Sequence, residues 1–194
     1  MSSTTDPEPP LSFESDAAWA VWLAENHGAS SGVWLRLAKK SSNASSVSYA
    51  QAIDVALCYG WIDGQKKGDS EQHWLQRFTP RTRTSIWSKI NRQKALALIA
   101  SGEMKAAGLK EVERAKSDGR WKDAYDSAKS ATVPSDLQVA LNLNAKAKAF
   151  FATLNGQNRY AVLFRIQTAK KSETRTKRIQ MFVEMLEKHE TLHP

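Results

Sequence analysis

Two stretches of the sequence hold residues suited to binding an anion, CYGWIDGQ at residues 58–65 and QRFTPRTRTSIWSKIN at residues 76–91. Arg77 and Arg81 stand close together in the second stretch, and residues 76–94 contain six basic residues and no acidic one. A guanidinium group can bind a carboxylate or a phosphate through two parallel hydrogen bonds, which a lysine ammonium cannot do. The spacing therefore predicts a site whose anionic preference is set by these two arginines.

A predicted helix begins shortly after these arginines. Ser88 is a suitable N-cap, and the unpaired N–H groups and the dipole at a helix N-terminus attract anions. We expect the two stretches to meet in one cleft with aromatic walls from Trp61 and Trp87. The predicted ligand-binding residues are Trp61, Asp63, Arg77, Arg81, Ser85, Trp87, Ser88 and Asn91.

Three alternative interpretations of these stretches need no ligand. Asp-Gly is a strong turn signal, so Asp63 and Gly64 can form a turn. Asp63 can also pair with Arg77 inside a hairpin and merely fix its corner. A basic run, finally, is often only a solvated surface.

The sequence favours a binding protein over an enzyme. It contains neither a glycine-rich phosphate loop nor a G-x-S-x-G motif. Only Asp63 and His73 could act as a base in the cleft, and no catalytic residue is assigned. Cys58 stands late in a predicted helix, where the dipole disfavours a thiolate, so we expect a buried core residue. A small enzyme that uses the same cleft stays an alternative.

Composition argues against a metal, a cofactor and a membrane span. The chain has one cysteine and four scattered histidines, so we expect neither a metal site nor a bound cofactor. The first residues lack the basic start and apolar core of a signal peptide. No apolar run approaches the roughly 20 residues needed to cross a bilayer. We therefore expect a cytoplasmic protein without membrane insertion.

The charge of the chain points to the class of partner. The formal net charge is +8 and the pI is about 9.6, with basic segments at residues 76–94 and 159–178. We expect an anionic small molecule or an acidic protein surface as the partner. Nucleic acid bound through the two basic segments is the alternative, and Arg175 and Arg178 would lie one turn apart on a helix there.

Hydrophobic periodicity and capping residues predict the elements that position these side chains. The expected helices lie at about residues 15–27, 48–59, 88–101, 106–117, 136–142, 145–154, 158–170 and 173–189. The expected strands lie at about residues 33–37, 61–67 and 72–79, and the last two form a β-hairpin that ends at Pro80. Ser48 and Gln51 should form a capping box at the start of the second helix.

The order of these elements predicts an α+β fold, in which a small antiparallel sheet packs with helices and a C-terminal helical subdomain follows. The expected divisions are a disordered tail at residues 1–10, an α+β domain at 11–126, a linker at 127–135 and the helical subdomain at 136–194. Phe150, Phe151, Phe164 and Phe182 are expected to share the core of this subdomain.

Several ordered motifs resemble a known protein family. CYGWIDGQ, QRFTPR, SIWSKIN, LIASGEMKAAGL and AKKSETRTKRI together are similar to the bacteriocin-protection, YdeI/OmpD-associated family over about residues 12–194. The resemblance implies a binding or stress-response protein, and the family's name refers to survival against antimicrobial peptides and to an outer-membrane protein. It carries over no catalytic residue.

Overall fold

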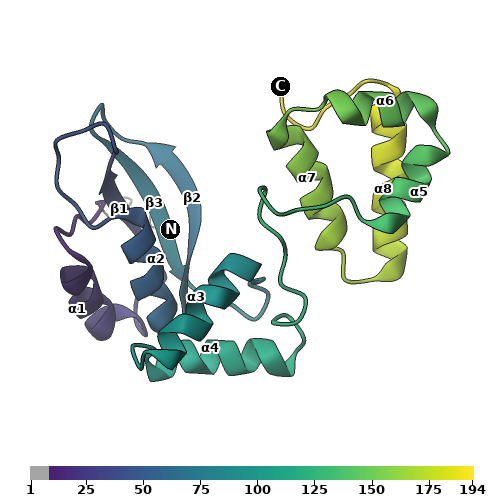
Figure 1. The fold of residues 1–194 in the computed structure, drawn as a ribbon. Coiled ribbons are helices and arrows are strands. Elements are labelled where there is room, and N and C mark those ends of the chain that lie inside the picture. The colour runs from purple at the N-terminus through teal and green to yellow at the C-terminus, as the bar shows by residue number, and fades with distance from the viewer. Residues whose placement is uncertain (1–8) are drawn as a thin grey trace, which may run out of the picture. The chain divides into compact units, whose positions relative to one another are not determined.

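The computed structural model describes residues 9–194, so residues 1–8 of the predicted tail lie outside the described residues. The chain divides into two units, each described here by itself (Figure 1). The first unit runs to residue 86 and includes residues 91–122, and the second contains residues 87–90 and 123–194. A small antiparallel sheet with helices is followed by further helices, which confirms the α+β class.

A three-stranded antiparallel sheet lies at the centre of the first unit. Its strands are, in spatial order, β1 (Val33–Ala38), β3 (His73–Pro80) and β2 (Trp61–Gly68), and β2 and β3 form the predicted hairpin. Side chains alternate along β1, so that Val33, Leu35 and Leu37 are buried on one side. We call this side the inner face of the sheet, and the side that carries Trp34 and Arg36 the outer face.

Helices α1 to α4 lie between residues 16 and 117. They are α1 (Asp16–Asn26), α2 (Tyr49–Cys58), α3 (Lys89–Ala100) and α4 (Ala106–Ser117). The predicted capping box of Ser48 and Gln51 is present at the start of α2. Ser15 caps α1 by accepting a hydrogen bond from the Ala18 N–H (3.2 Å). Local capping chemistry thus fixes where both helices begin.

Aromatic side chains fill the space between the inner face and α1. Trp19 of α1, Trp61 of β2 and Phe78 of β3 are almost completely buried. The ring centroid of Trp19 lies 5.7 Å from that of Phe78 and 6.4 Å from that of Trp61. Rings of this size bury a large apolar area, so this cluster stabilises the packing of α1 on the sheet.

A β-bulge interrupts β2 between Asp63 and Lys66, where β2 contains one residue more than β3. Gln76 of β3 is only 3 % exposed and lies at this point of the sheet. Its side-chain amide donates to the carbonyl oxygens of Gly64 (2.9 Å) and Gln65 (3.1 Å). Carbonyls displaced from the regular ladder therefore find a donor inside the sheet.

The bulge decides which face of the sheet each lysine of β2 occupies. Side chains alternate between the faces of a regular strand, so one extra residue moves every following side chain to the other face. After the bulge, Lys66 lies opposite Gln76 on the inner face. Lys67 lies opposite Leu75 on the outer face.

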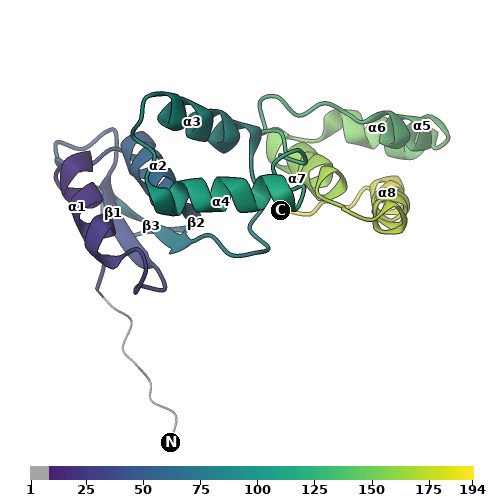
Figure 2. The same cartoon turned by 90° about the horizontal axis from the view of Figure 1, so that it is seen from below.

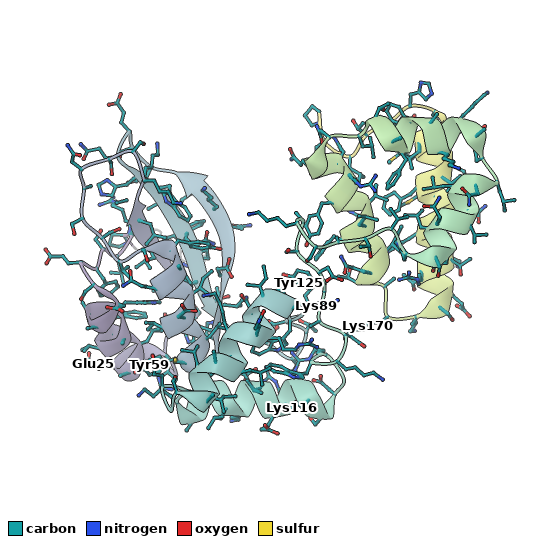
Figure 3. The ribbon with its side chains drawn as sticks, in the orientation of Figure 1. Glu25, Tyr59, Lys89, Lys116, Tyr125 and Lys170 are labelled. Carbon is teal, nitrogen blue, oxygen red and sulfur yellow. The ribbon has the colours of Figure 1, made fainter. Side chains whose placement is uncertain are left out.

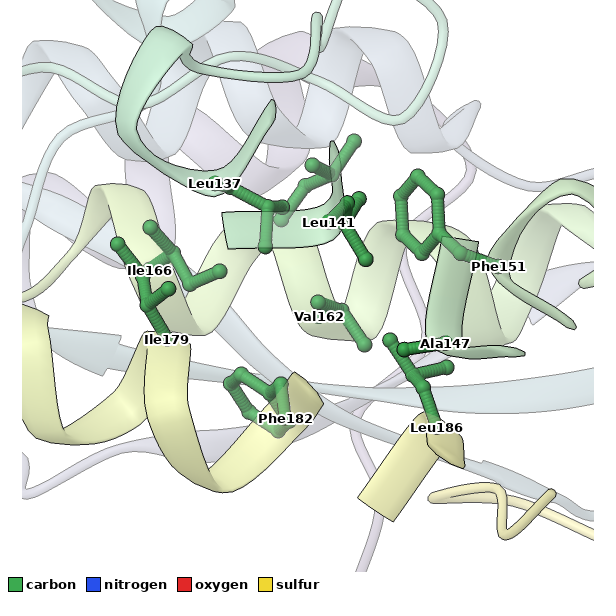
Figure 4. Close-up of a cluster of buried hydrophobic side chains, with 10 residues drawn as sticks. Leu137, Leu141, Ala147, Phe151, Val162, Ile166, Ile179, Phe182 and Leu186 are labelled. Carbon is green, nitrogen blue, oxygen red and sulfur yellow. The ribbon is translucent and has the colours of Figure 1, made fainter. Parts of the chain in front are cut away.

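The second unit contains four helices around one apolar core (Figure 4). They are α5 (Ser135–Asn142), α6 (Ala145–Thr153), α7 (Gly156–Gln167) and α8 (Ser172–Glu187). Figure 2 shows α8 end-on, beside α5 and α6. The buried core residues are Leu137, Leu141, Ala147, Phe151, Val162, Leu163, Ile166, Ile179, Phe182 and Leu186.

The core shared by four phenylalanines is confirmed for three of them. Phe151 and Phe182 belong to it, and Phe150 packs against it half-buried. Phe164 packs instead against Tyr125, with ring centroids 5.0 Å apart and the rings edge to face. The segment that carries Tyr125 thus covers part of α7 within the second unit.

Two arginines of the C-terminal basic segment are tied to the backbone of their own unit. The Arg175 Nη1 donates to the Ile166 carbonyl oxygen (3.0 Å), and the Arg178 Nη1 donates to that of Arg165. Arg175 also forms an ion pair with Asp136 of α5, with its Nε 2.5 Å from the carboxylate. These side chains satisfy carbonyls in the last turn of α7, so they have structural roles that need no nucleic acid.

Replacing Gln76 by leucine should destabilise the first unit. The bulge carbonyls would lose their donor inside the sheet, and a buried unsatisfied polar group costs about 1–3 kcal/mol. Scanning calorimetry should show the unfolding midpoint of this unit lowered by about 4 °C or more. Gln65→Leu, at an exposed position of the neighbouring strand β2, is the control and should change the midpoint little. Equal shifts for the two variants would contradict the role assigned to Gln76.

Asp136→Asn should remove a pH-dependent contribution to the stability of the second unit. The hydrogen bond from Arg175 holds the pKa of Asp136 below its ordinary range. A lowered folded-state pKa stabilises the fold above the unfolded value of about 4, and this stabilisation is lost as the pH falls further. Both side chains are partly exposed, so the loss at neutral pH should be no more than about 1 kcal/mol.

Calorimetry of the wild type and of Asp136→Asn at neutral and at strongly acidic pH measures this contribution. The difference in midpoint should be present at neutral pH and shrink in acid. Glu173→Gln, an exposed position in the first turn of α8, provides the comparison. A difference of the same size at both pH values would show that the ion pair is not its source.

Candidate functional site

The two tryptophans expected as walls of a cleft are both buried. Trp61 is 1 % exposed and Trp87 is 2 % exposed. The Trp61 indole N–H donates to the His27 carbonyl oxygen (3.2 Å), and its ring meets that of Trp22 edge-on at 6.0 Å. The prediction of aromatic walls is therefore wrong for these two residues, since packing inside the fold covers their rings.

Asp63 lies on the inner face of β2, directly before the bulge. Its carboxylate accepts a hydrogen bond from the Tyr49 hydroxyl (2.6 Å). Asp63 and Gly64 do not form the hairpin turn, which lies at residues 69–72 between β2 and β3. Arg77 belongs to the outer face, so the suggested pair between Asp63 and Arg77 does not form in the described part of the chain.

Arg77 and Arg81 occupy different environments. Arg77 is half-buried on the outer face opposite Trp34, with its Cζ 5.9 Å from the centre of that ring. Arg81 is only 5 % exposed, and its Nη1 donates to the Ile86 carbonyl oxygen (3.2 Å). The Arg81 guanidinium thus ties together the two ends of the loop at residues 81–86.

A second buried arginine fixes the same loop. Arg120 donates from its Nη1 to the Ser85 carbonyl oxygen (2.6 Å) and from its Nε to the Asp118 carboxylate (2.8 Å). The Ser85 hydroxyl accepts a hydrogen bond from the Thr82 N–H (2.9 Å). The carbonyl oxygen and the hydroxyl of Ser85 therefore both stabilise the loop in which it lies.

The N-terminus of α3 does not offer its first N–H to a ligand. The Lys89 N–H donates to the Tyr125 carbonyl oxygen (2.8 Å), and Ser88 forms an isolated parallel bridge with Tyr125. Figure 3 shows Lys89 and Tyr125 beside each other. The Lys89 ammonium pairs with the Asp126 carboxylate at 2.8 Å. The Lys89 N–H, which was expected to bind an anion, is therefore engaged by the backbone of the second unit.

The eight predicted ligand-binding residues are distributed over several environments. Trp87 and Ser88 group with the second unit, and the other six group with the first. Within the first unit, they comprise a core ring, one residue on each face of the sheet, two residues in the loop at 81–86, and the half-buried Asn91 in α3. The described geometry of each unit does not assemble them into one exposed cleft.

A hollow of about 890 Å³ opens at the end of the sheet next to the start of α2. It is lined by Ala38, Lys39, Lys40, Ser48, Tyr49, Ala50, Lys66, Lys67, Gly68 and Trp74. We call it the lysine hollow, because four of these ten residues are lysines and none carries a carboxylate. Its volume is typical of small-molecule sites.

An aromatic ring and a backbone carbonyl hold two of these lysines in place. The rings of Tyr49 and Trp74 lie 5.5 Å apart, and the Lys66 ammonium lies 4.2 Å from the centre of the Trp74 ring. The Lys39 ammonium donates to the Ser70 carbonyl oxygen (2.9 Å). The hollow thus combines positioned positive charge with aromatic surface, a combination that suits an anion.

Lys67 lines the rim of the hollow but directs its charge elsewhere. Its Nζ lies 4.2 Å from the centre of the Trp34 ring, on the outer face of the sheet. The positive charge of the hollow itself therefore comes from Lys39, Lys40 and Lys66.

Sequence reasoning missed this hollow, although two signals pointed to it. Lys39 and Lys40 directly follow a predicted strand, and Lys66 and Lys67 stand in the predicted hairpin. The higher arginine content of residues 77–83 drew the prediction there instead. The bulge that places Lys66 on the inner face has no simple signature in the sequence.

Cys58 is buried at the end of α2, as predicted. It borders a smaller hollow of about 270 Å³ whose lining includes Tyr59, Glu103 and Lys105. Burial raises the pKa of the Cys58 thiol to about 11, and the Glu103 carboxylate acts in the same direction. A protonated, buried thiol is a poor nucleophile.

Within residues 9–194, no group of three or more His, Cys, Asp or Glu side chains is arranged to hold a metal ion. In the same part of the chain, no helix combines the length and the apolar character that a membrane span requires.

Two family matches divide the chain. Residues 11–111 match the family described as Domain of unknown function (DUF8412). Residues 130–189 match the family described as Bacteriocin-protection, YdeI or OmpD-Associated, so the resemblance drawn from the sequence is confirmed over this range. The lysine hollow and all eight predicted ligand-binding residues lie in the first range. No curated protein and no solved structure matches the chain.

Native Cys58 should react slowly with disulfide reagents. Its raised folded-state pKa keeps the thiol protonated, and the thiolate is the reactive form. The same shift stabilises the fold fully below about pH 9, and this contribution is lost as the pH rises towards about 11. Labelling at mildly alkaline pH should be far slower without urea than in denaturing urea. Similar rates under the two conditions would contradict the burial of this thiol.

Proposed function

We propose that this chain binds a small anion in its lysine hollow. The chain belongs to the family described as Domain of unknown function (DUF8412). It also carries a Bacteriocin-protection, YdeI or OmpD-Associated domain at residues 130–189. The observation that carries the proposal is the composition of the hollow. Three ammonium groups surround a concave space of small-molecule size, and no lining residue is acidic. Such a site concentrates negative ions from solution.

The lysines suit phosphate-bearing ligands, because an ammonium binds a phosphate as a point charge and does not require a planar partner. An ammonium is a compact point charge with rotatable donors, whereas a guanidinium favours planar, bidentate partners. Lys39 and Lys66 are already held, by the Ser70 carbonyl oxygen and by the Trp74 ring. Side chains positioned before binding lose less conformational entropy when the ligand arrives, and this supports useful affinity.

Binding is proposed ahead of catalysis because of the groups that line the hollow. None of its ten lining residues is a histidine, a cysteine or a carboxylate. The nearby Asp63 carboxylate is engaged by the Tyr49 hydroxyl. The Cys58 thiol lies in a different hollow and is held protonated.

The name of the family that residues 130–189 match supports a physiological role of the bacteriocin-protection type. We therefore propose that anion binding in the first unit serves a cellular response to antimicrobial peptides, in the cytoplasm. A small anion is proposed ahead of an acidic protein surface because the hollow is concave.

Calorimetric titration with inorganic pyrophosphate tests the proposal. The wild type should bind pyrophosphate, with an affinity that falls as salt is added, since exposed charges are screened. Lys40→Ala and Lys66→Ala should each weaken binding by about fivefold or more, as expected when a charge-assisted hydrogen bond is lost. Their unfolding midpoints should stay close to that of the wild type, since both side chains are exposed.

Lys148→Ala is the matched control, because it removes an exposed lysine from α6 of the second unit. It should leave the pyrophosphate affinity unchanged. The proposal fails if the wild type shows no binding of pyrophosphate, or if Lys148→Ala weakens binding as much as Lys40→Ala and Lys66→Ala do.

A further inference from the structure

The outer face of the sheet carries a second basic and aromatic surface. Its members follow from the strand register and are Trp34, Arg36, Ala38, Ile62, Lys67, His73, Leu75, Arg77 and Thr79. Leu75 is buried, and the others are half-buried or exposed. None carries a carboxylate, so the face as a whole is positive.

Trp34 is the centre of this surface. Lys67 Nζ lies 4.2 Å and Arg77 Cζ lies 5.9 Å from the centre of its ring. The two cations come from β2 and β3, whereas the ring comes from β1. All three strands thus converge on one aromatic ring, and the two cations lie over it.

The backbone beside Arg77 is fitted to this arrangement. Gly32 precedes β1 with a φ of +133°, a conformation that side chains disfavour. A Cβ at Gly32 would lie 2.7 Å from the Phe78 carbonyl oxygen and 3.0 Å from the Arg77 Nη2. The absence of a side chain at Gly32 therefore leaves room for the Arg77 guanidinium at the end of the sheet.

Arg36 adds charge at the other end of the same face. Its Nε donates to the Asp69 carboxylate at 2.9 Å, and this pair is solvent-accessible. Accessible pairs of this kind contribute little to stability, so little free energy is lost if Arg36 turns to another anion. Arg36 therefore lies in reach of a second anionic group on the same surface.

We propose that the outer face binds single-stranded nucleic acid, with a base that takes the place of the Lys67 ammonium over the Trp34 ring and phosphates contacted by Lys67 and Arg77. Exposed aromatic side chains on a small sheet stack bases, and neighbouring cations track the backbone. Stacking is largely independent of sequence because every base has a π-face. Trp34 and Arg77 do not line the lysine hollow, and Lys67 lies at its rim with its ammonium on the outer face.

The aromatic ring at the centre is the reason for choosing nucleic acid over an acidic protein. Carboxylates would satisfy Lys67 and Arg77 but would offer Trp34 no ring to stack against. A duplex keeps its bases stacked inside the helix, so it could contact the cations but not the ring. Of these three partners, only a single strand uses all three side chains together.

Filter binding with oligo-uridine and oligo-thymidine strands of about ten nucleotides tests this inference. The wild type should retain both, and retention should fall steeply as salt is raised. Trp34→Ala should weaken binding by about fivefold or more, in line with the loss of one base stack. Lys67→Ala and Arg77→Ala should weaken binding and reduce the salt dependence. These two variants decide the question if Trp34→Ala does not fold.

Lys66→Ala is the matched control, because Lys66 and Lys67 are adjacent residues on opposite faces. Lys67→Ala should weaken oligonucleotide binding, and Lys66→Ala should leave it unchanged. Arg77 does not line the hollow, so Arg77→Ala should weaken oligonucleotide binding and leave pyrophosphate binding unchanged. The inference is overturned if the wild type retains no oligonucleotide, or if Lys66→Ala and Lys67→Ala weaken oligonucleotide binding equally. It is also overturned if a duplex of the same length binds as tightly, or if polyglutamate displaces the strand as readily as oligo-uridine does.

Discussion

The hydrogen bonds from the Gln76 amide to the bulge carbonyls set the chemistry of both faces of the sheet. They support one extra residue in β2, and the extra residue places Lys66 on the inner face and Lys67 on the outer face. Without the bulge, the period of two would exchange the faces of these lysines. A single buried polar side chain thus decides which charge stands beside Trp74 and which beside Trp34.

Arginine and lysine have different tasks in this protein. Arg81 and Arg120 are buried and donate to carbonyl oxygens of the loop at residues 81–86, and Arg175 and Arg178 donate to those of α7. The rigid fork of a guanidinium suits it to satisfy backbone groups that no helix or sheet pairs. Much of the arginine-rich sequence is therefore structural, and the lysines supply much of the exposed positive charge around the hollow.

Local signals predicted the elements well but not the site. The capping box at Ser48, the alternation along β1 and the two arms of the hairpin act within a few residues, and each appears as expected. The turn assigned to Asp63 and Gly64 was wrong, because a longer-range partner, Gln76, stabilises an extended bulge there. The prediction that Trp61 and Trp87 form exposed walls failed for a similar reason. The sequence shows that an aromatic ring is present, but only the packed fold shows what covers it.

The distribution of tryptophan makes the two units optically unequal. Trp87 belongs to the second unit, and the other six of the seven tryptophans belong to the first. The stacked indoles of Trp19 and Trp22, 5.4 Å apart and inclined by 15°, are close enough to couple their electronic transitions. Indole emission and near-ultraviolet dichroism will therefore report mainly on the first unit. The second unit, whose core is aliphatic and phenylalanine, is reported by a single indole, that of Trp87.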